Sequence, residues 1–371
     1  MKSFHIVPEI VMYDTCQEFA KTVSITDDDL VLTNRYIWEP YFGELEYTPH
    51  LVFVEEYGTG EPSDEMVEAI VADCEAFSYQ RVIAIGGGTI IDISKLFALR
   101  QISPVLDLYD HKVTAHKEKE LLILPTTCGT GSEVTNISIL ELCSRHTKLG
   151  LADDALYADQ AVLVPELLKG LPFRFFATSS IDALIHSVES YLSPKASVFT
   201  EMYSLRAIEM ILHGYQKIAK EGEQARMEIL SDFALASTYA GIAFGNAGCA
   251  AVHAMSYPLG AIYHVPHGES NYAIFTGVLE AYSAQKPDGK IKSLNQYLAT
   301  LLGANEENIY AELEKLLNQI IQKKALHEYG MKHEEIQDFT DNVMTKQGRL
   351  MANNYTTLTV EDVKQIYEKL Y

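Results

Sequence analysis

A run of three glycines separates a strand pattern from a helical pattern in the first half of the chain. Gly86, Gly87 and Gly88 follow the apolar segment 82–85, and the helical pattern begins at Thr89. Glycines at a strand end let backbone N–H groups approach a ligand, and the next helix adds the positive end of its dipole. This order predicts a parallel α/β sheet with a phosphate site at its edge, although a plain tight turn would leave the same pattern.

The rest of the first 150 or so residues also alternates between strand and helix patterns. Short apolar runs at 30–33, 51–54, 82–85 and 121–124 are typical of strands buried in a parallel sheet. Ser63 can cap a helix between two of these strands. From about Pro172 helical periodicity dominates to the C-terminus. We therefore predict a doubly wound α/β dinucleotide-binding domain over residues 1–171 and an all-α domain over residues 172–371.

A second loop strengthens the prediction of a dinucleotide site. Residues 125–135 follow the apolar run 121–124 and are rich in hydroxyl groups and glycines. If the two strands are neighbours, both loops lie at the carboxyl edge of the sheet, where such folds bind their ligands. Two unrelated surface loops remain the alternative.

Four side chains in the second half could hold one divalent ion: Asp182, His186, His253 and His267. Asp182 and His186 are four residues apart and would share one helix face. Three imidazoles and a carboxylate leave room for a substrate oxygen, and they fit Fe²⁺ or Zn²⁺ without choosing between them. Each histidine alone could be an ordinary core or loop residue, but a buried Asp182 needs a cation. Glu189, on the same face, either orients a ligand or is simply solvated.

Charge and cysteine content restrict the possible partners. The chain has 51 acidic and 29 basic residues, a formal net charge of −22, so we expect neither nucleic acid nor an anionic membrane as a partner. Five widely spaced cysteines without a C-x-x-C pair indicate free thiols in a reducing compartment. The N-terminus lacks a signal-peptide pattern, and the apolar segment 233–257 resembles one buried helix rather than a membrane span. We therefore expect a cytoplasmic protein.

Together, the glycine turn, the second loop and the four candidate ligands resemble the iron-containing (group III) alcohol dehydrogenase family. The resemblance covers nearly the whole chain. It implies a nicotinamide-binding domain and a helical metal domain with ligands Asp182, His186, His253 and His267. It also implies cofactor contacts from the following residues: Gly87, Gly88, Thr89, Asp92, Thr126, Thr127, Thr130 and Lys148.

Two positions depart from the usual pattern of this family. Asn34, followed by Arg35, stands where many members carry an Asp beside the adenosine ribose. The resemblance implies NAD as cofactor, but this change leaves NADP possible. Tyr257 stands where alcohol-oxidising members often carry a further His. Tyr257 or the nearby His264 could relay a proton or seat the substrate, and either could instead be a wall of the pocket.

Three segments, 95–97, 145–154 and 257–269, resemble the branch that interconverts 4-hydroxybutyrate and succinate semialdehyde with NAD(H). The resemblance implies a small hydroxy acid or its aldehyde as substrate, Fe²⁺ or else Zn²⁺ as metal, and a homodimer. The alternatives are a dehydrogenase of the same family for another small alcohol or diol, and a non-redox metalloenzyme (a synthase or hydrolase) on the same scaffold. No residue in the sequence identifies the group that would bind the substrate carboxylate.

Overall fold

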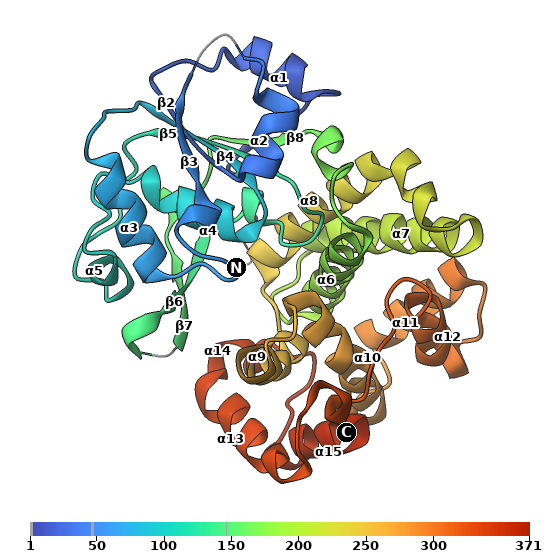
Figure 1. The fold of residues 1–371 in the computed structure, drawn as a ribbon. Helices are drawn as coiled ribbons and strands as arrows, with labels where there is room; N and C mark the ends of the chain where they lie inside the picture. The colour runs from blue at the N-terminus through green and yellow to red at the C-terminus, as the bar shows by residue number, and fades with distance from the viewer. Residues whose placement is uncertain (1–2, 46–47, 146) are drawn as a thin grey trace. The chain divides into compact units, whose positions relative to one another are not determined.

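The computed structural model describes residues 3–45, 48–145 and 147–371, which form two compact units (Figure 1). One unit is Ile6–Leu171, and the other is Pro172–Tyr371 together with the first few residues. The expected first domain began at residue 1, but residues 3–5 contact the helical unit instead. The His5 N–H donates to Asn246 Oδ1 at 2.8 Å, and the Phe4 ring stacks on Phe199 with ring centroids 5.2 Å apart.

The described residues of the first unit contain a six-stranded, fully parallel sheet in the order β1-β8-β5-β4-β2-β3. Its strands are β1 (Glu9–Met12), β2 (Asp29–Thr33), β3 (His50–Phe53), β4 (Arg81–Gly86), β5 (Glu120–Pro125) and β8 (Gln160–Leu163). The four apolar runs of the sequence are β2 to β5. The sequence did not reveal β1 and β8, because β1 is a largely exposed edge strand and both are short.

Helices cover both faces of this sheet, which confirms the doubly wound α/β fold (Figure 1). They are α1 (Cys16–Val23), α2 (Arg35–Phe42), α3 (Asp64–Cys74), α4 (Gly88–Phe97) and α5 (Val105–Tyr109). Alternate side chains of β4 point to opposite faces. Val82 packs with residues of α3, α4 and α5, whereas Ile83 packs with residues of α1 and α2. Ser63 caps α3 as predicted, since its Oγ accepts the Met66 N–H at 3.2 Å.

An antiparallel hairpin that the sequence did not reveal also belongs to the first unit. It consists of β6 (Ile137–Leu142) and β7 (Thr147–Ala152), and it packs against α4. Buried and exposed residues alternate along β6, so only one face of that strand is apolar. Such a pattern is weaker than the continuous apolar runs of the parallel strands.

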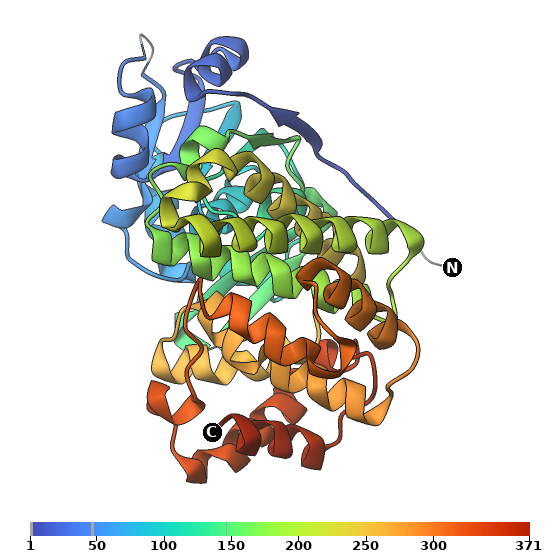
Figure 2. The same cartoon turned by 90° about the vertical axis from the view of Figure 1, so that its right-hand side faces the viewer.

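The second unit is helical, as expected, and none of its residues 172–371, all of which are described, lies in a strand (Figure 2). Its helices are α6 (Phe173–Leu192), α7 (Val198–Glu221), α8 (Leu230–Ala247), α9 (Ala251–Tyr263), α10 (His267–Gln285), α11 (Lys290–Leu302), α12 (Ile309–Leu317), α13 (Ile336–Lys346), α14 (Gly348–Met351) and α15 (Val360–Leu370). Among the described residues, no helix is both long enough and apolar enough to span a membrane.

The segment 233–257 differs from the expectation of one buried helix. Gly248, with φ of 78°, ends α8, and a new helix begins at Ala251. Pro258 lies inside α9, which continues to Tyr263. Proline removes only one backbone donor and can be tolerated in a helix that tertiary packing supports. The break at Gly248 matters for the site, because it sets the direction in which α9 leaves.

Candidate active site

The four predicted metal ligands lie together in the helical unit. Asp182 Oδ1 is 3.6 Å from His253 Nε2 and 3.8 Å from His267 Nε2, and Asp182 Oδ2 is 3.8 Å from His186 Nδ1. These distances are too long for hydrogen bonds. Two ligands of one Zn²⁺-like ion can be at most about 4 Å apart, which is twice a bond of about 2.1 Å. The spacing therefore fits a shared cation.

Three helices deliver these ligands. Asp182 and His186 project from one face of α6, His253 lies in the first turn of α9, and His267 begins α10. Gly268 lets α10 approach α6, because a Cβ at this position would lie 1.9 Å from the Thr178 backbone oxygen. Asp182, His186 and His253 are buried, whereas 41% of the His267 side chain is exposed.

Glu189 is buried and holds His253 in place, so the interpretation that it is solvated was wrong. Its carboxylate accepts the backbone N–H of Ala250 at 3.0 Å and that of Val252 at 2.7 Å. Glu189 Oε2 also lies 2.6 Å from His253 Nδ1, which places the ring proton on Nδ1. The opposite ring nitrogen, Nε2, therefore faces Asp182. It is buried and has no hydrogen-bond partner within the described part of the chain.

The electrostatics of the cluster favour a bound cation. Burial alone would lower the pKa of His253, but Glu189 and Asp182 outweigh it and raise that pKa to about 9. Burial would raise the pKa of Asp182, but His186, His267 and His253 outweigh it and lower that pKa. The cluster thus attracts positive charge, and a divalent ion bound by the same nitrogen and oxygen atoms would supply it. The residues present therefore fit a metal ion.

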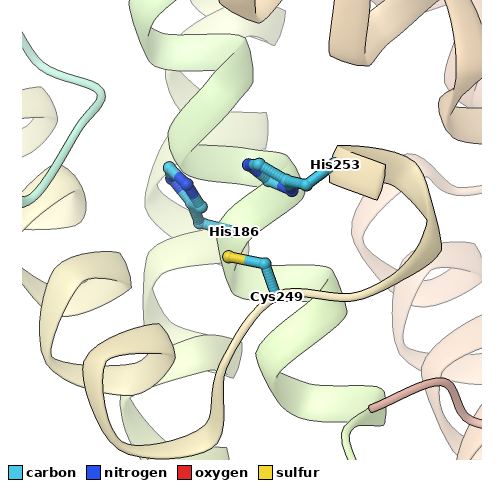
Figure 3. Close-up of side chains that lie close together, drawn as sticks. All are labelled: His186, Cys249 and His253. Carbon is cyan, nitrogen blue, oxygen red and sulfur yellow. The ribbon is translucent and has the colours of Figure 1, made fainter. Parts of the chain in front are cut away.

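Two further residues reach this cluster that sequence reasoning did not find. Asn271 Nδ2 donates to Asp182 Oδ1 at 2.8 Å and lies 3.2 Å from His267 Nε2. The Cys249 thiol lies beside the imidazoles of His186 and His253 (Figure 3), with ligand atoms of the three within 4.8 Å of one another. Spacings of four residues, from His267 to Asn271 and from Cys249 to His253, were the only signals in the sequence.

The two residues predicted to assist catalysis lie in different surroundings. The Tyr257 ring is partly buried on α9, and its centroid is 6.1 Å from that of His267. His264 follows the end of α9 in left-handed backbone, with φ of 52°, and is exposed. Within the described residues, no hydrogen bond, ion pair or ring contact joins His264 to the metal cluster.

The two predicted cofactor loops lie side by side in the α/β unit. Strands β4 and β5 pair in register, with Gly86 opposite Pro125, and the Thr126 N–H donates to Gly86 O at 3.0 Å. A Cβ on Gly88 would lie 3.1 Å from Thr130 Cγ2, and one on Gly87 would lie 3.3 Å from Thr127 Cγ2. Thr127 Oγ1 is buried without a hydrogen-bond partner among the described residues, so it can bind a ligand.

Asp92 lies beneath these loops and joins them to the hairpin. Its carboxylate accepts Ser132 Oγ at 2.7 Å and the Ile139 N–H at 3.0 Å. The ammonium of Lys95, a fully buried residue, is 3.6 Å from Asp92 and donates to Ser132 Oγ and Ile137 O, each at 2.6 Å. Burial raises the pKa of Asp92, and Lys95 opposes this rise. Asp92 is therefore placed to position the loops rather than to extend toward a ligand.

Two other predicted cofactor residues are held in place by acidic partners, and a third bonds to backbone. Lys148 on β7 forms an ion pair with Glu61 at 3.4 Å, and Thr89 Oγ1 donates to Gly60 O at 3.0 Å. Asn34, directly after β2, donates its side-chain amide to Glu55 Oε2 at 2.6 Å. The other Glu55 oxygen accepts the Arg35 N–H at 2.7 Å. Glu55 thus places a carboxylate beside Asn34, although position 34 itself is not acidic.

Comparison with known proteins gives matches along the whole chain. Residues 11–165 match the family model of iron-containing alcohol dehydrogenases, and residues 176–371 match its C-terminal counterpart. A 4-hydroxybutyrate dehydrogenase from Clostridium kluyveri is 50% identical over 371 residues, which is 100% of both chains. A long-chain-alcohol dehydrogenase from Geobacillus thermodenitrificans is 34% identical over 84% of this chain and 80% of its own.

Solved structures share the fold at low sequence identity. An iron-containing alcohol dehydrogenase from Thermococcus thioreducens has a TM-score of 0.85 at 23% identity, covering 100% of this chain and 99% of its own. The two family models and the full-length relative decide the assignment. This chain belongs to the iron-containing alcohol dehydrogenase family.

Proposed function

We propose that this protein interconverts 4-hydroxybutyrate and succinate semialdehyde with NAD(H), using one divalent metal ion. The observation that carries the proposal is the 50% identity, over the full length of both chains, to the 4-hydroxybutyrate dehydrogenase of Clostridium kluyveri. Family membership alone would leave the substrate open, because the more distant relative from Geobacillus thermodenitrificans is named for long-chain alcohols.

Asp182, His186, His253 and His267 would hold the metal, which we propose to be Fe²⁺ with Zn²⁺ as the alternative. A bound divalent ion supplies Lewis-acid polarisation of the substrate oxygen and so eases loss of the hydroxyl proton. Glu189 keeps the His253 ring in the orientation in which Nε2 faces the cluster. Asn271 fixes the Asp182 carboxylate through its amide. Tyr257, beside His267, would form a wall of the substrate site, and we assign no role to His264.

The paired loops of the α/β unit would bind the cofactor. Backbone N–H groups at Gly87, Gly88 and Thr89, at the start of α4, suit the pyrophosphate. The hydroxyl groups of Thr126, Thr127 and Thr130 and the ammonium of Lys148 add polar contacts. Asn34 and the neighbouring Glu55 carboxylate would face the adenosine ribose, where negative charge favours NAD over NADP. A protein of the same fold, a sulfoacetaldehyde reductase from Bifidobacterium kashiwanohense, was solved in complex with NAD⁺.

Steady-state kinetics test this proposal and separate it from its alternatives. NADH formation would be followed with chelator-treated and with Fe²⁺- or Zn²⁺-loaded protein, using 4-hydroxybutyrate, 1,4-butanediol and butan-1-ol. We expect metal-dependent turnover that is fastest with 4-hydroxybutyrate. Preference for the uncharged alcohols would replace the substrate, and metal binding without any NADH would favour a non-redox metalloenzyme. We also propose that the protein is cytoplasmic and forms a homodimer. Sedimentation of the purified protein would check the oligomeric state.

A further inference from the structure

The substrate named above carries a carboxylate, yet the chain has a formal net charge of −22, so binding requires a specific cation. Arg349 is distinctive among the arginines. In the described part of the chain, six arginines form ion pairs, namely Arg35, Arg81, Arg100, Arg145, Arg174 and Arg206, and Arg226 packs over two phenylalanine rings. No ion pair or ring contact there involves Arg349, which is exposed.

Arg349 lies on a segment that packs against the helix carrying part of the metal cluster. It belongs to α14, which packs against α9, the helix that carries His253 and Tyr257. Asn353, two residues after α14, donates its side-chain amide to Ala247 O at 2.9 Å and to Cys249 O at 3.1 Å, so this segment lies against the turn that carries Cys249. Tyr257 and Cys249 flank the cluster. Cys249 adjoins His186 and His253, and Tyr257 adjoins His267.

We propose that Arg349 binds the carboxylate of the substrate while the hydroxyl end lies at the metal cluster. This inference rests on the function proposed above. A guanidinium presents paired N–H donors that match both oxygens of a carboxylate, and it stays charged at any physiological pH. Arg174 is another cation in this region. It already pairs with Glu269, two residues after His267, at 3.2 Å and is therefore partly neutralised. Arg349 thus selects hydroxy acids over uncharged alcohols.

Three variants test this role: Arg349→Gln, Arg349→Lys and the control Arg206→Gln, which removes an exposed arginine paired with Glu209. We expect Arg349→Gln to lower kcat/KM for 4-hydroxybutyrate about 10- to 100-fold, mainly through KM, because it loses a charge-assisted contact. Turnover of butan-1-ol should change by less than about twofold. Arg349→Lys should recover part of the loss, and Arg206→Gln should resemble the wild type. Equal losses for both substrates in Arg349→Gln would overturn the proposal.

Binding of butyrate, which has the carboxylate but no hydroxyl group, separates this inference from the proposed function. Calorimetry on metal-loaded wild type and Arg349→Gln, with equal metal content and melting temperature, measures that binding without catalysis. We expect the variant to bind butyrate at least about tenfold more weakly. If the wild type does not oxidise 4-hydroxybutyrate, the proposed function fails, but Arg349-dependent butyrate binding still supports carboxylate binding by Arg349. Unchanged butyrate affinity in Arg349→Gln contradicts that role, whatever the enzyme oxidises.

Discussion

Single side chains decide how the metal cluster is held, and Glu189 is the best example. One buried carboxylate accepts two N–H groups at the start of α9 and also contacts His253 Nδ1. The same side chain therefore fixes both a helix start and the orientation of an imidazole. Partners of this kind commonly change metal affinity about 10- to 100-fold when they are removed.

Glu189→Gln should therefore weaken metal binding about 10- to 100-fold, because the amide carries no charge and only one of its two groups accepts hydrogen bonds. Competition against a coloured chelator measures the affinity. Glu280→Gln, which removes an exposed carboxylate paired with Lys369, is the matched control and should change nothing. Equal affinities in wild type and Glu189→Gln would show that Glu189 does not support the ligand.

Glu55 is expected to disfavour NADP, since it places a carboxylate beside Asn34. Glu55→Gln should raise kcat/KM with NADP about tenfold and leave the value with NAD nearly unchanged, because a 2′-phosphate would no longer meet this charge. Initial rates with both cofactors measure the ratio. Glu118→Gln, an exposed carboxylate paired with Arg100, serves as the control. An unaltered NADP-to-NAD ratio would move the ribose site away from Glu55.

Cys249 reports on the metal because its sulfur adjoins two proposed ligands. Bound Zn²⁺ should slow alkylation of Cys249 at least several-fold relative to chelator-treated protein, since the ion occupies the space and charge that the reagent needs. Peptide mass spectrometry measures each thiol separately. Cys143, a partly exposed thiol in the α/β unit, should react at the same rate in both samples. Metal-independent alkylation of Cys249 would place the ion elsewhere.

The sequence revealed some of these residues and not others for a physical reason. Asp182 and His186 were predictable, because a four-residue spacing places both on one helix face. Glu189 was placed on the same helix face, but the sequence left its role open because its partners lie at the start of α9. Cys249 and Asn271 reach the cluster only through the break before α9 and the packing of α10 on α6. Arg349 is 96 residues after His253 in the numbering, and nothing local marks it as a neighbour. Tertiary contacts of this kind leave no pattern in one sequence.

Among the helices and strands, two glycines control how the ligand-bearing helices meet. Gly248, whose φ is 78°, supplies the positive-φ backbone that separates α8 from α9, and Gly268 allows α10 to approach α6. The prediction of one helix across 233–257 failed because apolar periodicity continues through Gly248, and glycine in a helical pattern is often tolerated. Continuous apolar runs identified the central strands well, whereas the hairpin strands β6 and β7 have only one apolar face.

Gly268→Ala should destabilise the helical unit by about 1–3 kcal/mol and weaken metal binding, because the added Cβ would collide with the Thr178 carbonyl oxygen. Chemical denaturation and metal titration measure the two effects. Gly260→Ala is the matched control, since Gly260 lies within α9 and a Cβ there would be in ordinary contact, 3.5 Å from Val265 O. A Gly268→Ala protein with wild-type stability and metal affinity would contradict the close approach of α10 to α6.

For the whole molecule, the two units divide the proposed chemistry. The paired loops lie in Ile6–Leu171, and the metal cluster lies in Pro172–Tyr371. The division between α/β and helical regions was predictable, because strand patterns fade near Pro172 and each unit has enough residues for its own core. The placement of residues 3–5 with the helical unit was not predictable, since it depends on single contacts such as His5 with Asn246.

Metal and NAD should each protect a different unit from hydrogen exchange, because a ligand stabilises the structure that binds it. Zn²⁺ should slow exchange in α6, α9 and α10, and NAD should slow it in the loops after β4 and β5. Mass spectrometry of peptides from chelator-treated, Zn²⁺-loaded and NAD-loaded protein measures both patterns. Protection of the glycine turn by Zn²⁺, without protection of α6, would place the metal in the α/β unit and contradict the proposed site.

Anomalous diffraction from crystals of the active, metal-loaded protein tests most directly whether one divalent ion bound by Asp182, His186, His253 and His267 supports turnover. Data collected on both sides of the metal's absorption edge locate the ion without reference to activity. We predict one strong peak at about 2.0–2.2 Å from a carboxylate oxygen of Asp182 and from the nitrogens of the three histidines. A fully active crystal sample with no peak at this cluster, or with its metal bound elsewhere, would contradict the account.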